Sequence, residues 1–554
     1  MRTTKSILLV CGLLVGLAGG GYSGQAGEQS AEKECGKDIE LSEADDHDAA
    51  IERFDEALRL DPKNAMALGD RGAAFLRKGE LDKAIADLSQ AIRLNPEYAV
   101  ALTNRGAAFL RKGELDKAIA DSSQAVLLDP TDSMAFTNRG VALWKKGDFK
   151  EAVADFDRAV RLDPKNARAW SNRAASFLEK DDWDKAIADF DEAIRLNPKD
   201  WMSLRSRGIA HMRKGNLGKA LADLDEAIWL NPKDAVSLRS RGMVLARLGA
   251  LGRAIDDFSE AIRINPNDKM ALIERSVAFL NVGAFNRTIA DATRVLQLDP
   301  NNATAFNNKG AALLRKGQFE KELVDFNEAI RLNPKNSIAF SNRGVVHMNM
   351  GELDKALVDL NESLRLAPTD AMALSNRAAV FSRKGEFDKE IADLSEAIRL
   401  NPRDASSLND RATAYMDTDQ FDKAIADFSA MLRINPTDTW ALTKRGNAFM
   451  ETDELDKAIA DFSEVIRINP KDPMGYCKRG AALLRKGESE KGLADLDEMI
   501  RLNPKPPALP DELGDSHGKA GKSEEPIANG EEVPQYRPDE AAAEQSSRPG
   551  NIPR

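Results

Sequence analysis

The chain has 554 residues, with 79 Lys and Arg against 90 Asp and Glu, for a formal net charge of −11. This acidic balance argues against a nucleic-acid-binding protein, because no excess of basic residues is left to meet phosphates. Charged residues make up 31% of the chain and aromatic residues only 6%. Such a composition suits many thin helical layers better than one thick hydrophobic core.

The first 26 residues have the features of a secretory signal peptide. Two basic residues precede an apolar run from Ile7 to Ala18, and small residues continue as far as Ala26. The run is short for a membrane span, so we expect cleavage near Ala26 and export, either to the periplasm or as a secreted protein. An uncleaved signal that anchors the chain and lipidation at Cys11 are the alternatives. No integral membrane span is predicted after cleavage.

Two short segments follow the signal peptide. Residues 27–46 are acidic and without apolar periodicity, which predicts a linker. In residues 47–64 the apolar side chains of Ala50, Phe54 and Ala57 precede Pro62 at helical spacing. We interpret residues 47–64 as a partial repeat that caps the array described next.

From residue 65 the chain follows a strict period. A proline recurs every 34 residues from Pro62 to Pro504 without insertion or deletion, which defines thirteen units over residues 65–506. Numbering the places of each unit from 1 to 34, beginning at Ala65, apolar or small residues fall at places 4, 8 and 11 and again at 20, 24 and 27. This spacing predicts two helices, separated near place 15 and closed by the proline.

The unit resembles the tetratricopeptide repeat. The fourth unit matches the family pattern at every place, with Trp170, Ala174, Phe177, Ala186, Phe190, Ala193 and Pro198. The resemblance implies an all-α fold, a right-handed α-solenoid or superhelix of helix-turn-helix units. It also implies a non-catalytic scaffold for protein–protein interaction.

After the repeats the composition changes sharply. Residues 507–554 are rich in Pro, Glu and Gly and hold few apolar side chains. Such a segment cannot bury enough apolar surface to fold, so we predict a disordered tail.

Two charged places recur with the helices. Every full unit carries Arg or Lys at place 7 and Asp at place 23. We expect a structural ion pair that joins the two helices of a unit or neighbouring units, rather than a basic stripe for nucleic acid.

The resemblance places a ligand on the concave side, where in this family the first helix presents places 2, 5, 6, 9, 12 and 13. Place 6 holds a broken row of asparagines: Asn104, Asn138, Asn172, Asn308, Asn342 and Asn376. A similar row in the family grips the backbone of an extended peptide, because an amide offers both a donor and an acceptor. The alternative is that asparagine here is a common helix residue without a ligand.

Places 12 and 13 complete the predicted peptide site. The cations Arg111, Lys145, Arg213 and Arg247 at place 13 predict a preference for an acidic ligand, and Trp144 and Met212 at place 12 predict apolar contacts. Methionine also recurs at place 2, where its flexibility suits varied partners. The alternative is that these residues seal adjacent repeats.

Some units depart from the pattern. Ser276, Thr288 and Ala292 weaken the unit that begins at Lys269. Glutamate replaces the usual alanine of place 20 at Glu322 and Glu390, where it must reach solvent or lower stability.

No constellation of catalytic residues, metal ligands or phosphate-binding glycines is present in the sequence. We therefore predict no enzymatic activity and no cofactor. The predicted partners are protein or peptide segments, with no nucleic acid. The alternative is a structural solenoid that self-assembles and has no peptide in its groove.

Overall fold

The computed structural model describes residues 47–317 and 319–503. The predicted signal peptide, acidic linker and C-terminal tail lie outside the described residues. The described part of the chain divides into two compact units, unit 1 up to Asp419 and unit 2 from Gln420. Each unit is described separately.

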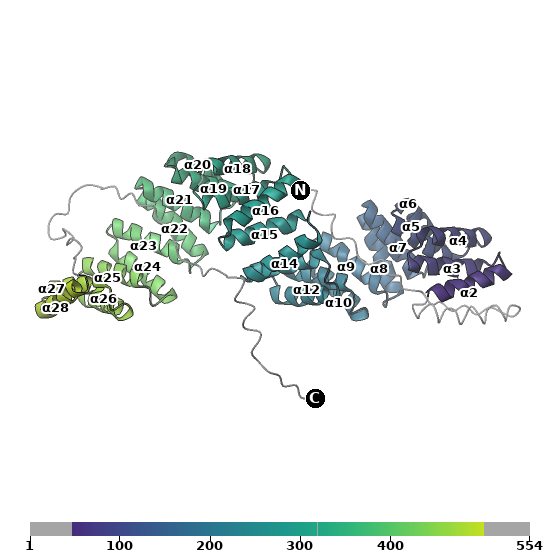
Figure 1. Cartoon of the computed structure of the whole chain (residues 1–554), viewed down its shortest axis with the longest axis horizontal. Helices are drawn as coiled ribbons and strands as arrows, with labels where there is room; N and C mark the ends of the chain where they lie inside the picture. Colours follow the sequence, from purple (N-terminus) through teal and green to yellow (C-terminus); the bar gives the residue numbers. More distant parts are fainter. Residues whose placement is uncertain (1–46, 318, 504–554) are drawn as a thin grey trace, which may run out of the picture. The chain divides into compact units, whose positions relative to one another are not determined.

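The described residues form helices and no strands. In unit 1 the helices are α2 (His47–Leu60), α3 (Ala65–Lys78), α4 (Leu81–Leu94), α5 (Ala99–Lys112), α6 (Leu115–Leu128), α7 (Ser133–Lys146), α8 (Phe149–Leu162), α9 (Ala167–Glu179), α10 (Trp183–Leu196), α11 (Trp201–Arg213), α12 (Leu217–Leu230), α13 (Ala235–Arg247), α14 (Leu251–Ile264), α15 (Lys269–Asn281), α16 (Phe285–Leu298), α17 (Ala303–Leu314), α18 (Phe319–Leu332), α19 (Ser337–Asn349), α20 (Leu353–Leu366), α21 (Ala371–Lys384), α22 (Phe387–Leu400) and α23 (Ala405–Asp417). In unit 2 they are α24 (Phe421–Ile434), α25 (Thr439–Glu451), α26 (Leu455–Ile468), α27 (Pro473–Lys486) and α28 (Ser489–Leu502). The all-α fold of two-helix repeats predicted from the period is confirmed. Figure 1 shows that, within each compact unit, the helix pairs of successive repeats follow one another in chain order.

Local signals set the helix ends. Asn or Asp at place 34 caps most first helices, as where the Asn64 side chain accepts a hydrogen bond from the Ala67 N–H at 2.9 Å. Glycine at place 15 ends the first helix in the left-handed region, as at Gly79 with φ 83°. Three repeats hold aspartate in that conformation instead, namely Asp181, Asp419 and Asp453.

The core of each repeat forms where its two helices cross. A Cβ added at Gly140 of α7 would lie 2.7 Å from Cε1 of Phe156 on α8, which itself is fully buried. Glycine at place 8 therefore lets the helix backbone approach a large side chain at place 24. The same contact recurs at Gly242 and Phe258.

The predicted ion pair between places 7 and 23 is confirmed. Arg71 donates from Nε and Nη2 to both carboxylate oxygens of Asp87, at 2.7 and 2.8 Å, and from Nη1 to Asp55 of the preceding second helix at 2.6 Å. One arginine thus joins three helices through a bidentate, partly buried contact, the strong form of this interaction. The two-oxygen contact recurs within both units at Arg105–Asp121, Arg139–Asp155, Arg173–Asp189, Arg207–Asp223, Arg241–Asp257, Arg275–Asp291, Arg343–Asp359, Arg377–Asp393, Arg445–Asp461 and Arg479–Asp495.

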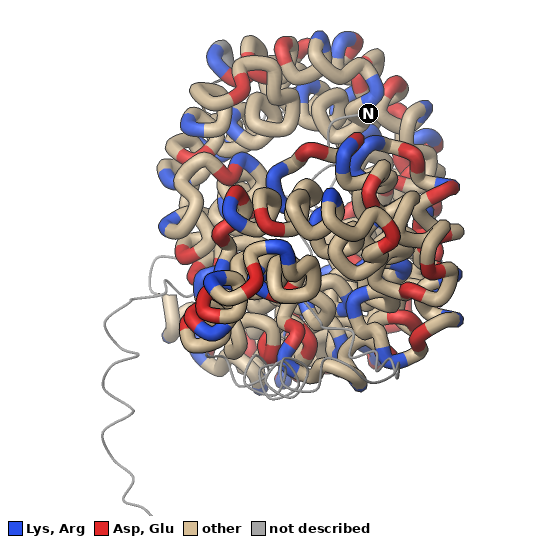
Figure 2. The backbone as a smooth tube through the Cα atoms, turned by 90° about the vertical axis from the view of Figure 1, so that its right-hand side faces the viewer, with Lys and Arg blue, Asp and Glu red and all other residues tan. Residues whose placement is uncertain are grey.

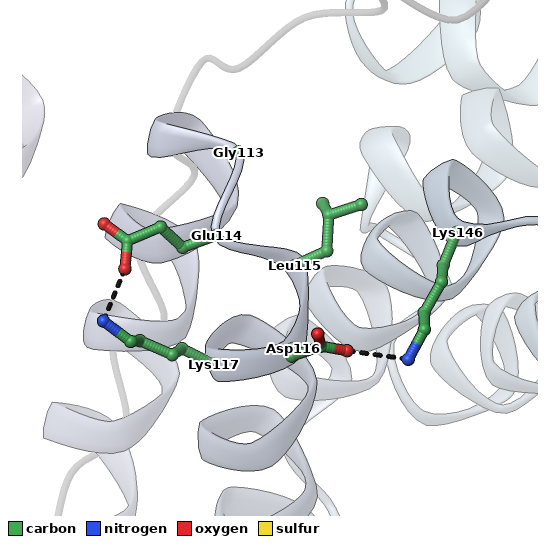
Figure 3. Close-up of a pocket in the computed structure, with 6 residues that line it drawn as sticks. All are labelled: Gly113, Glu114, Leu115, Asp116, Lys117 and Lys146. Atoms are coloured by element: carbon green, nitrogen blue, oxygen red, sulfur yellow. Dashed lines mark hydrogen bonds and ion pairs between the residues drawn. The ribbon is translucent and has the colours of Figure 1, made fainter.

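A second, exposed set of ion pairs links successive repeats. Lys146 Nζ lies 2.7 Å from Asp116 of the preceding repeat, beside a pair between Lys117 and Glu114 (Figure 3). These residues line a shallow hollow of about 430 Å³ whose counterpart recurs one repeat earlier around Lys112. Because it recurs at the equivalent place of successive repeats, the hollow is a feature of the repeat itself, and its exposed ion pairs contribute only about 0–1 kcal/mol each.

Both signs of charge are interspersed along the helices on the side of the molecule shown in Figure 2. None of the helices in the described ranges is long and apolar enough to cross a membrane.

Candidate functional site on the inner face

The first helices of the repeats form the closer-packed side of unit 1. Successive first helices pack against one another, as α3 does on α5, α5 on α7, and α17 on α19. No comparably extensive packing joins successive second helices among the described residues. The stack therefore curves toward its first helices. We call the side chains at places 2, 5, 6, 9 and 13 of these helices the inner face.

The second run of asparagines on this face is engaged by the fold. Each amide donates from Nδ2 to the first helix of the preceding repeat: Asn308 to Ser276 Oγ at 2.9 Å, Asn342 to Asn307 Oδ1 at 3.0 Å, and Asn376 to Ser341 Oγ at 3.2 Å. These three residues thus tie successive first helices together.

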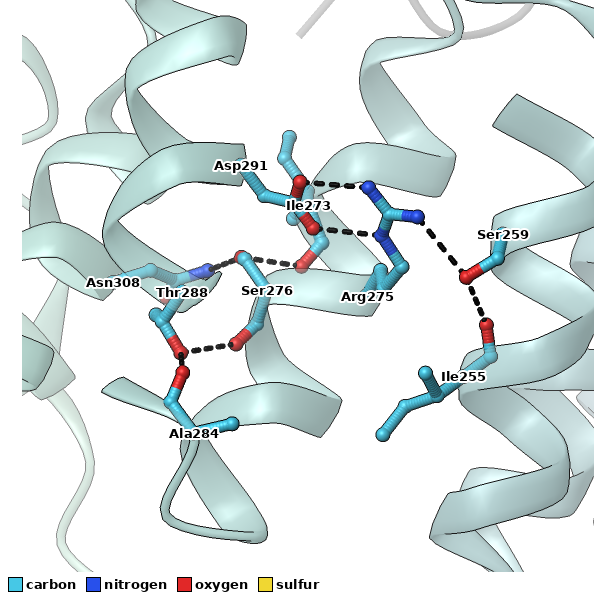
Figure 4. Close-up of polar contacts among 9 residues, drawn as sticks. All are labelled: Ile255, Ser259, Ile273, Arg275, Ser276, Ala284, Thr288, Asp291 and Asn308. Atoms are coloured by element: carbon cyan, nitrogen blue, oxygen red, sulfur yellow. Dashed lines mark hydrogen bonds and ion pairs between the residues drawn. The ribbon is translucent and has the colours of Figure 1, made fainter. Parts of the chain in front are cut away.

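The weakened repeat of α15 and α16 shows how such a network forms (Figure 4). Ser276 accepts from Asn308 and donates to the Ile273 carbonyl at 2.7 Å, while Thr288 Oγ1 donates to the Ser276 carbonyl at 3.3 Å. Thr288 is fully buried at the usual alanine place. Hydrogen bonds therefore replace part of the apolar packing that other repeats have here.

The side-chain amides of the first run of asparagines make fewer hydrogen bonds within the fold. Asn138 is 1% exposed and donates to the Thr103 carbonyl at 3.3 Å, but its Oδ1 has no hydrogen-bond partner among the described residues. Asn172 is 5% exposed, and its Nδ2 likewise has none. Asn104 is half-buried. A buried polar atom without a hydrogen bond costs about 1–3 kcal/mol, so the amides of Asn138 and Asn172 are expected to bond to water or ligand.

Two of the cations at place 13 bond to the preceding repeat and so stabilise the fold. Arg111 Nη1 donates to the Leu76 carbonyl at 2.6 Å and Arg247 Nη1 to the Met212 carbonyl at 3.2 Å, each at the end of the preceding first helix. A cation at a helix C-terminus is favourable because it meets the negative end of the helix dipole. Lys145 and Arg213 are exposed.

Trp144 and Met212 pack in the apolar core of the array. Trp144 is 6% exposed and packs edge to face on Phe149, with ring centroids 4.7 Å apart. Met212 is 3% exposed in a cluster with Ala220, Leu224 and Val244. Both side chains therefore contribute to the packing of the repeats.

Sequence reasoning missed three arginines on the inner face. Arg205 and Arg239 at place 5 form ion pairs with Asp234, at 3.2 Å, and Asp268, at 2.5 Å, which cap the first helices of the following repeats. Arg168 at place 2 of α9 makes no hydrogen bond or ion pair with any described residue. Burial, together with the nearby charge of Arg111, lowers the pKa of Arg168 to about 10.

Apolar side chains at place 2 are exposed on the same face. They include Met66, Val100, Met270, Ile338 and Met372, of which Met372 is 74% exposed. Methionine at this place was recognised in the sequence, and its exposure leaves it available to an apolar partner.

Acidic side chains gather where α21, α22 and α23 pack. Glu390 of α22 is 4% exposed, so it does not reach solvent. Burial, then the charges of Asp410 and Asp417 on α23, raise the pKa of Glu390 to about 7, against a hydrogen bond from Ser382 that lowers it. Burial also raises the pKa of Asp410. Within the described ranges no group of His, Cys, Asp or Glu is arranged to hold a metal ion.

Comparison with solved structures finds other helical repeat proteins. Cut9 in the APC/C Cut9–Hcn1 hetero-tetramer is 14% identical and matches 80% of this chain and 95% of its own, with a TM-score of 0.41. Yeast Tom70 is 19% identical over 80% of this chain and 98% of its own, with a TM-score of 0.36. YrrB, described as a TPR protein with an unusual peptide-binding site, is 23% identical over 33% of this chain and 95% of its own, with a TM-score of 0.30.

No curated protein matches the chain in sequence. A family model described as TPR repeat matches residues 72–113 and 446–487. The tetratricopeptide repeat model matches residues 137–201, 205–269, 274–337, 341–405 and 376–439, together more than half of the chain. The chain therefore belongs to the tetratricopeptide repeat family, whose members are typically scaffolds for protein–protein interaction.

Proposed function

We propose that the protein is an exported, non-catalytic scaffold that binds an extended peptide segment on the inner face of unit 1, at α5, α7 and α9. The observation that carries the proposal is the difference between the two asparagine runs. Asn308, Asn342 and Asn376 donate to preceding helices, whereas Asn138 and Asn172 keep buried amide atoms without hydrogen bonds.

The chemistry of the amide supports a peptide ligand. Each peptide unit has one N–H donor and one C=O acceptor, and an asparagine side chain offers the complementary pair whatever the peptide sequence. Asn138 has an acceptor and Asn172 a donor without an internal partner, on neighbouring first helices. This pair matches the two polar groups of a backbone.

Hydrogen bonds alone do not account for stable binding. Each contributes about 0.5–1.5 kcal/mol net, against an association cost of about 4–15 kcal/mol. The exposed apolar side chains at place 2, such as Met66 and Val100, supply further contact area on the adjoining helices.

The matched asparagine runs provide the test. One variant carries Asn104→Ala and Asn172→Ala, and its control carries Asn342→Ala and Asn376→Ala. Both are used with the unaltered chain to capture partners from envelope and secreted fractions. We expect the first variant to lose the captured peptide-bearing partner and the control to keep it, with circular dichroism showing both folded. Equal capture by all three proteins would contradict the proposal.

Export is tested separately. We expect the mature protein, isolated from its native source, to begin near Gly27 and to be recovered outside the cytoplasm. N-terminal sequencing of the isolated protein decides this. A chain that begins at Met1 in a cytoplasmic fraction contradicts export without affecting the peptide site.

Self-assembly is the competing structural role. Sedimentation equilibrium over a hundredfold range of concentration is expected to give one monomeric mass. A mass that rises with concentration would favour the self-assembling solenoid.

A further inference from the structure

The last described helix, α28, lacks the neighbour that the other second helices of unit 2 have. α24 packs against the following first helix α25, and α26 packs against α27, but no described first helix follows α28. Ile500 at place 28 of α28 is 50% exposed, whereas its counterpart Ile466 on α26 is 9% exposed. Leu493 at place 21 is 57% exposed. α28 therefore presents apolar side chains that the repeat normally buries.

Two carboxylates lie between these apolar side chains. Glu490 at place 18 and Asp497 at place 25 are exposed, and neither forms an ion pair with a described residue. Together with Leu493 and Ile500 they recur at three- and four-residue spacing, so all four share one side of the helix. We call these four side chains the terminal stripe.

The first described helix pair shows what an equivalent stripe contacts. On α2 the places of the two carboxylates hold Asp48 and Asp55. Lys78 of α3 donates from Nζ to Asp48 at 2.5 Å, and Arg71 of α3 donates from Nη1 to Asp55 at 2.6 Å. Equivalent pairs recur at Arg173–Asp157, Arg207–Asp191 and Lys486–Asp456. An acidic side chain at place 18 or 25 thus meets a basic side chain of the next first helix.

The apolar contact requires a small residue on the neighbouring helix. On α27 a Cβ added at Gly475 would lie 3.0 Å from Cγ1 of Ile466, the counterpart of Ile500. Ala67 of α3 belongs to the same cluster as Leu58 of α2. Place 3 is Ala, Ser or Gly in every full unit. A helix that packs on the terminal stripe therefore needs a small residue, an Arg four positions later and a Lys seven positions after that.

We propose that the terminal stripe of α28 docks an amphipathic helix of another protein. The Arg and Lys of that helix, seven residues apart, pair with Asp497 and Glu490, while its small residue packs on Ile500. Burial of Leu493 and Ile500 supplies favourable free energy, and the two ion pairs set the register of the bound helix. The site belongs to unit 2 and is separate from the peptide face proposed for α5, α7 and α9.

The chain itself does not supply such a helix. Residues 1–46 and 504–554 contain no two basic residues seven positions apart, and four prolines fall within residues 504–510. The first helices from α3 to α21, together with α25 and α27, each pack between two second helices. A second copy of the chain therefore offers none of these helices for docking, which leaves a different protein as the occupant.

The test uses a helical peptide of defined sequence and the purified full chain. The first probe is fluorescein-labelled and copies residues 64–79, the α3 segment with its caps. A hydrocarbon staple replaces Met66 and Asp70, at places 2 and 6, because an isolated helix of this length is marginal in water. The second probe is identical except for Gln in place of Arg71 and Lys78. Fluorescence anisotropy measures the binding of both.

The variants change the terminal stripe one side chain at a time. Asp497→Asn removes the partner of the probe's arginine, and Ile500→Ser removes the apolar contact. The matched control is Glu498→Gln, which also removes one negative charge from α28 but lies next to the stripe, where Glu498 pairs with Arg501.

We expect the first probe to bind about tenfold more tightly than the Gln probe, because two ion pairs distinguish them. Asp497→Asn should weaken the first probe about fivefold and leave the Gln probe unchanged, since the effect requires both partners. Ile500→Ser should weaken both probes about tenfold, and Glu498→Gln should change neither. Saturation with the first probe should slow hydrogen exchange of the α28 amides, which places the peptide on that helix.

Four results contradict the inference. Equal weakening by Asp497→Asn and Glu498→Gln would indicate general charge attraction. Binding of neither probe at about 100 µM would reject the docking surface. A mass that rises with concentration and becomes monomeric in Ile500→Ser would assign the stripe to a second copy. Loss of the first probe from the variant with Asn104→Ala and Asn172→Ala would place it on the inner face, whereas unchanged binding there keeps the two proposals separate.

Discussion

Lys309 donates a single hydrogen bond to Oδ1 of Asp325, at 2.9 Å, and Oδ2 of that buried carboxylate has no hydrogen-bond partner among the described residues. In the repeats around it an arginine bonds to both oxygens. Burial raises the pKa of Asp325, and the contact with Lys309 only partly offsets this. Lysine at this place therefore forms a weaker ion pair between the two helices of its repeat than arginine does.

Replacing Lys309 with arginine should strengthen the ion pair with Asp325. The second hydrogen bond to a charged acceptor is expected to raise the opening free energy of α17 and α18 by about 1 kcal/mol. Hydrogen exchange of the amides in these two helices measures this directly. The reverse change in the next repeat, Arg343→Lys, is the control and should lower the opening free energy of α19 and α20. No change in either variant would show that the second oxygen contact contributes nothing.

Asp181 to glycine should stabilise the fourth repeat. Asp181 has φ 58°, in the left-handed region that other repeats reach with glycine. That conformation costs an L-residue about 1–2 kcal/mol, so relief should slow exchange in α9 and α10 by up to about tenfold. Gly79→Ala is the opposite test, since a Cβ there meets nothing within 4 Å and only the backbone is strained. Unfolding temperatures that move in the same direction for both would contradict this account.

Glu390 should make the stability of its repeat depend on pH. Its pKa of about 7 in the folded chain lies above the ordinary value of 4.5, so the folded state holds a proton that the unfolded state releases. The stabilisation is complete below about pH 4.5 and is lost as pH rises through 7. The raised pKa corresponds to a loss of about 3 kcal/mol from the free energy of unfolding once the pH is above 7.

Alanine at Glu390 should remove that dependence. We expect the unfolding temperature of the unaltered chain to fall between pH 5 and 8, and that of Glu390→Ala to fall less. Glu396→Ala, which removes a carboxylate that is 41% exposed on the same helix, serves as the control. If the Glu390 and Glu396 variants follow the same pH profile, the buried carboxyl is not the cause.

The substitution Trp144→Ala should lower the stability of the fold, because Trp144 is a core residue rather than a ligand contact. The side chain packs in the cluster with Phe109, Leu110 and Phe156, and removal of such a buried aromatic costs about 3–5 kcal/mol. Faster hydrogen exchange throughout α7 and α8 is the expected outcome. An unaltered exchange rate together with lost peptide binding would instead assign Trp144 to the ligand face.

The repeat architecture could be predicted because its signals are local or strictly periodic. The spacing of places 8 and 24, illustrated by Gly140 and Phe156, sets both helices and their crossing. The partnership of Arg71 with Asp87 was likewise visible as two places that recur in every unit. The acceptor of Nη1 on the preceding repeat was not foreseen, because several residue types serve there, including Asp55 and Ser89.

The availability of each asparagine could not be predicted in the same way. Asn104 and Asn342 occupy the same place of their repeats, but only Asn342 donates a hydrogen bond to Asn307 on the preceding first helix. The outcome depends on a residue 35 positions away and on the packing of two helices. Arg168 was missed for a related reason: the recurring methionines at place 2 indicate apolar contacts, and the lack of a partner for Arg168 is evident only in three dimensions.

The central claim is that a peptide lies on the inner face at α5, α7 and α9. Site-specific photo-crosslinking tests it most directly, with a benzophenone amino acid placed at Asn104 and, as a control, at Leu127, which is 74% exposed on the second helix α6. Crosslinked partners in native extract are identified by mass spectrometry. We predict that Asn104 crosslinks to a segment of another protein, that Asn172→Ala abolishes this product, and that Leu127 gives none. A partner crosslinked equally from Leu127, or crosslinks only to further copies of the chain, would contradict the account.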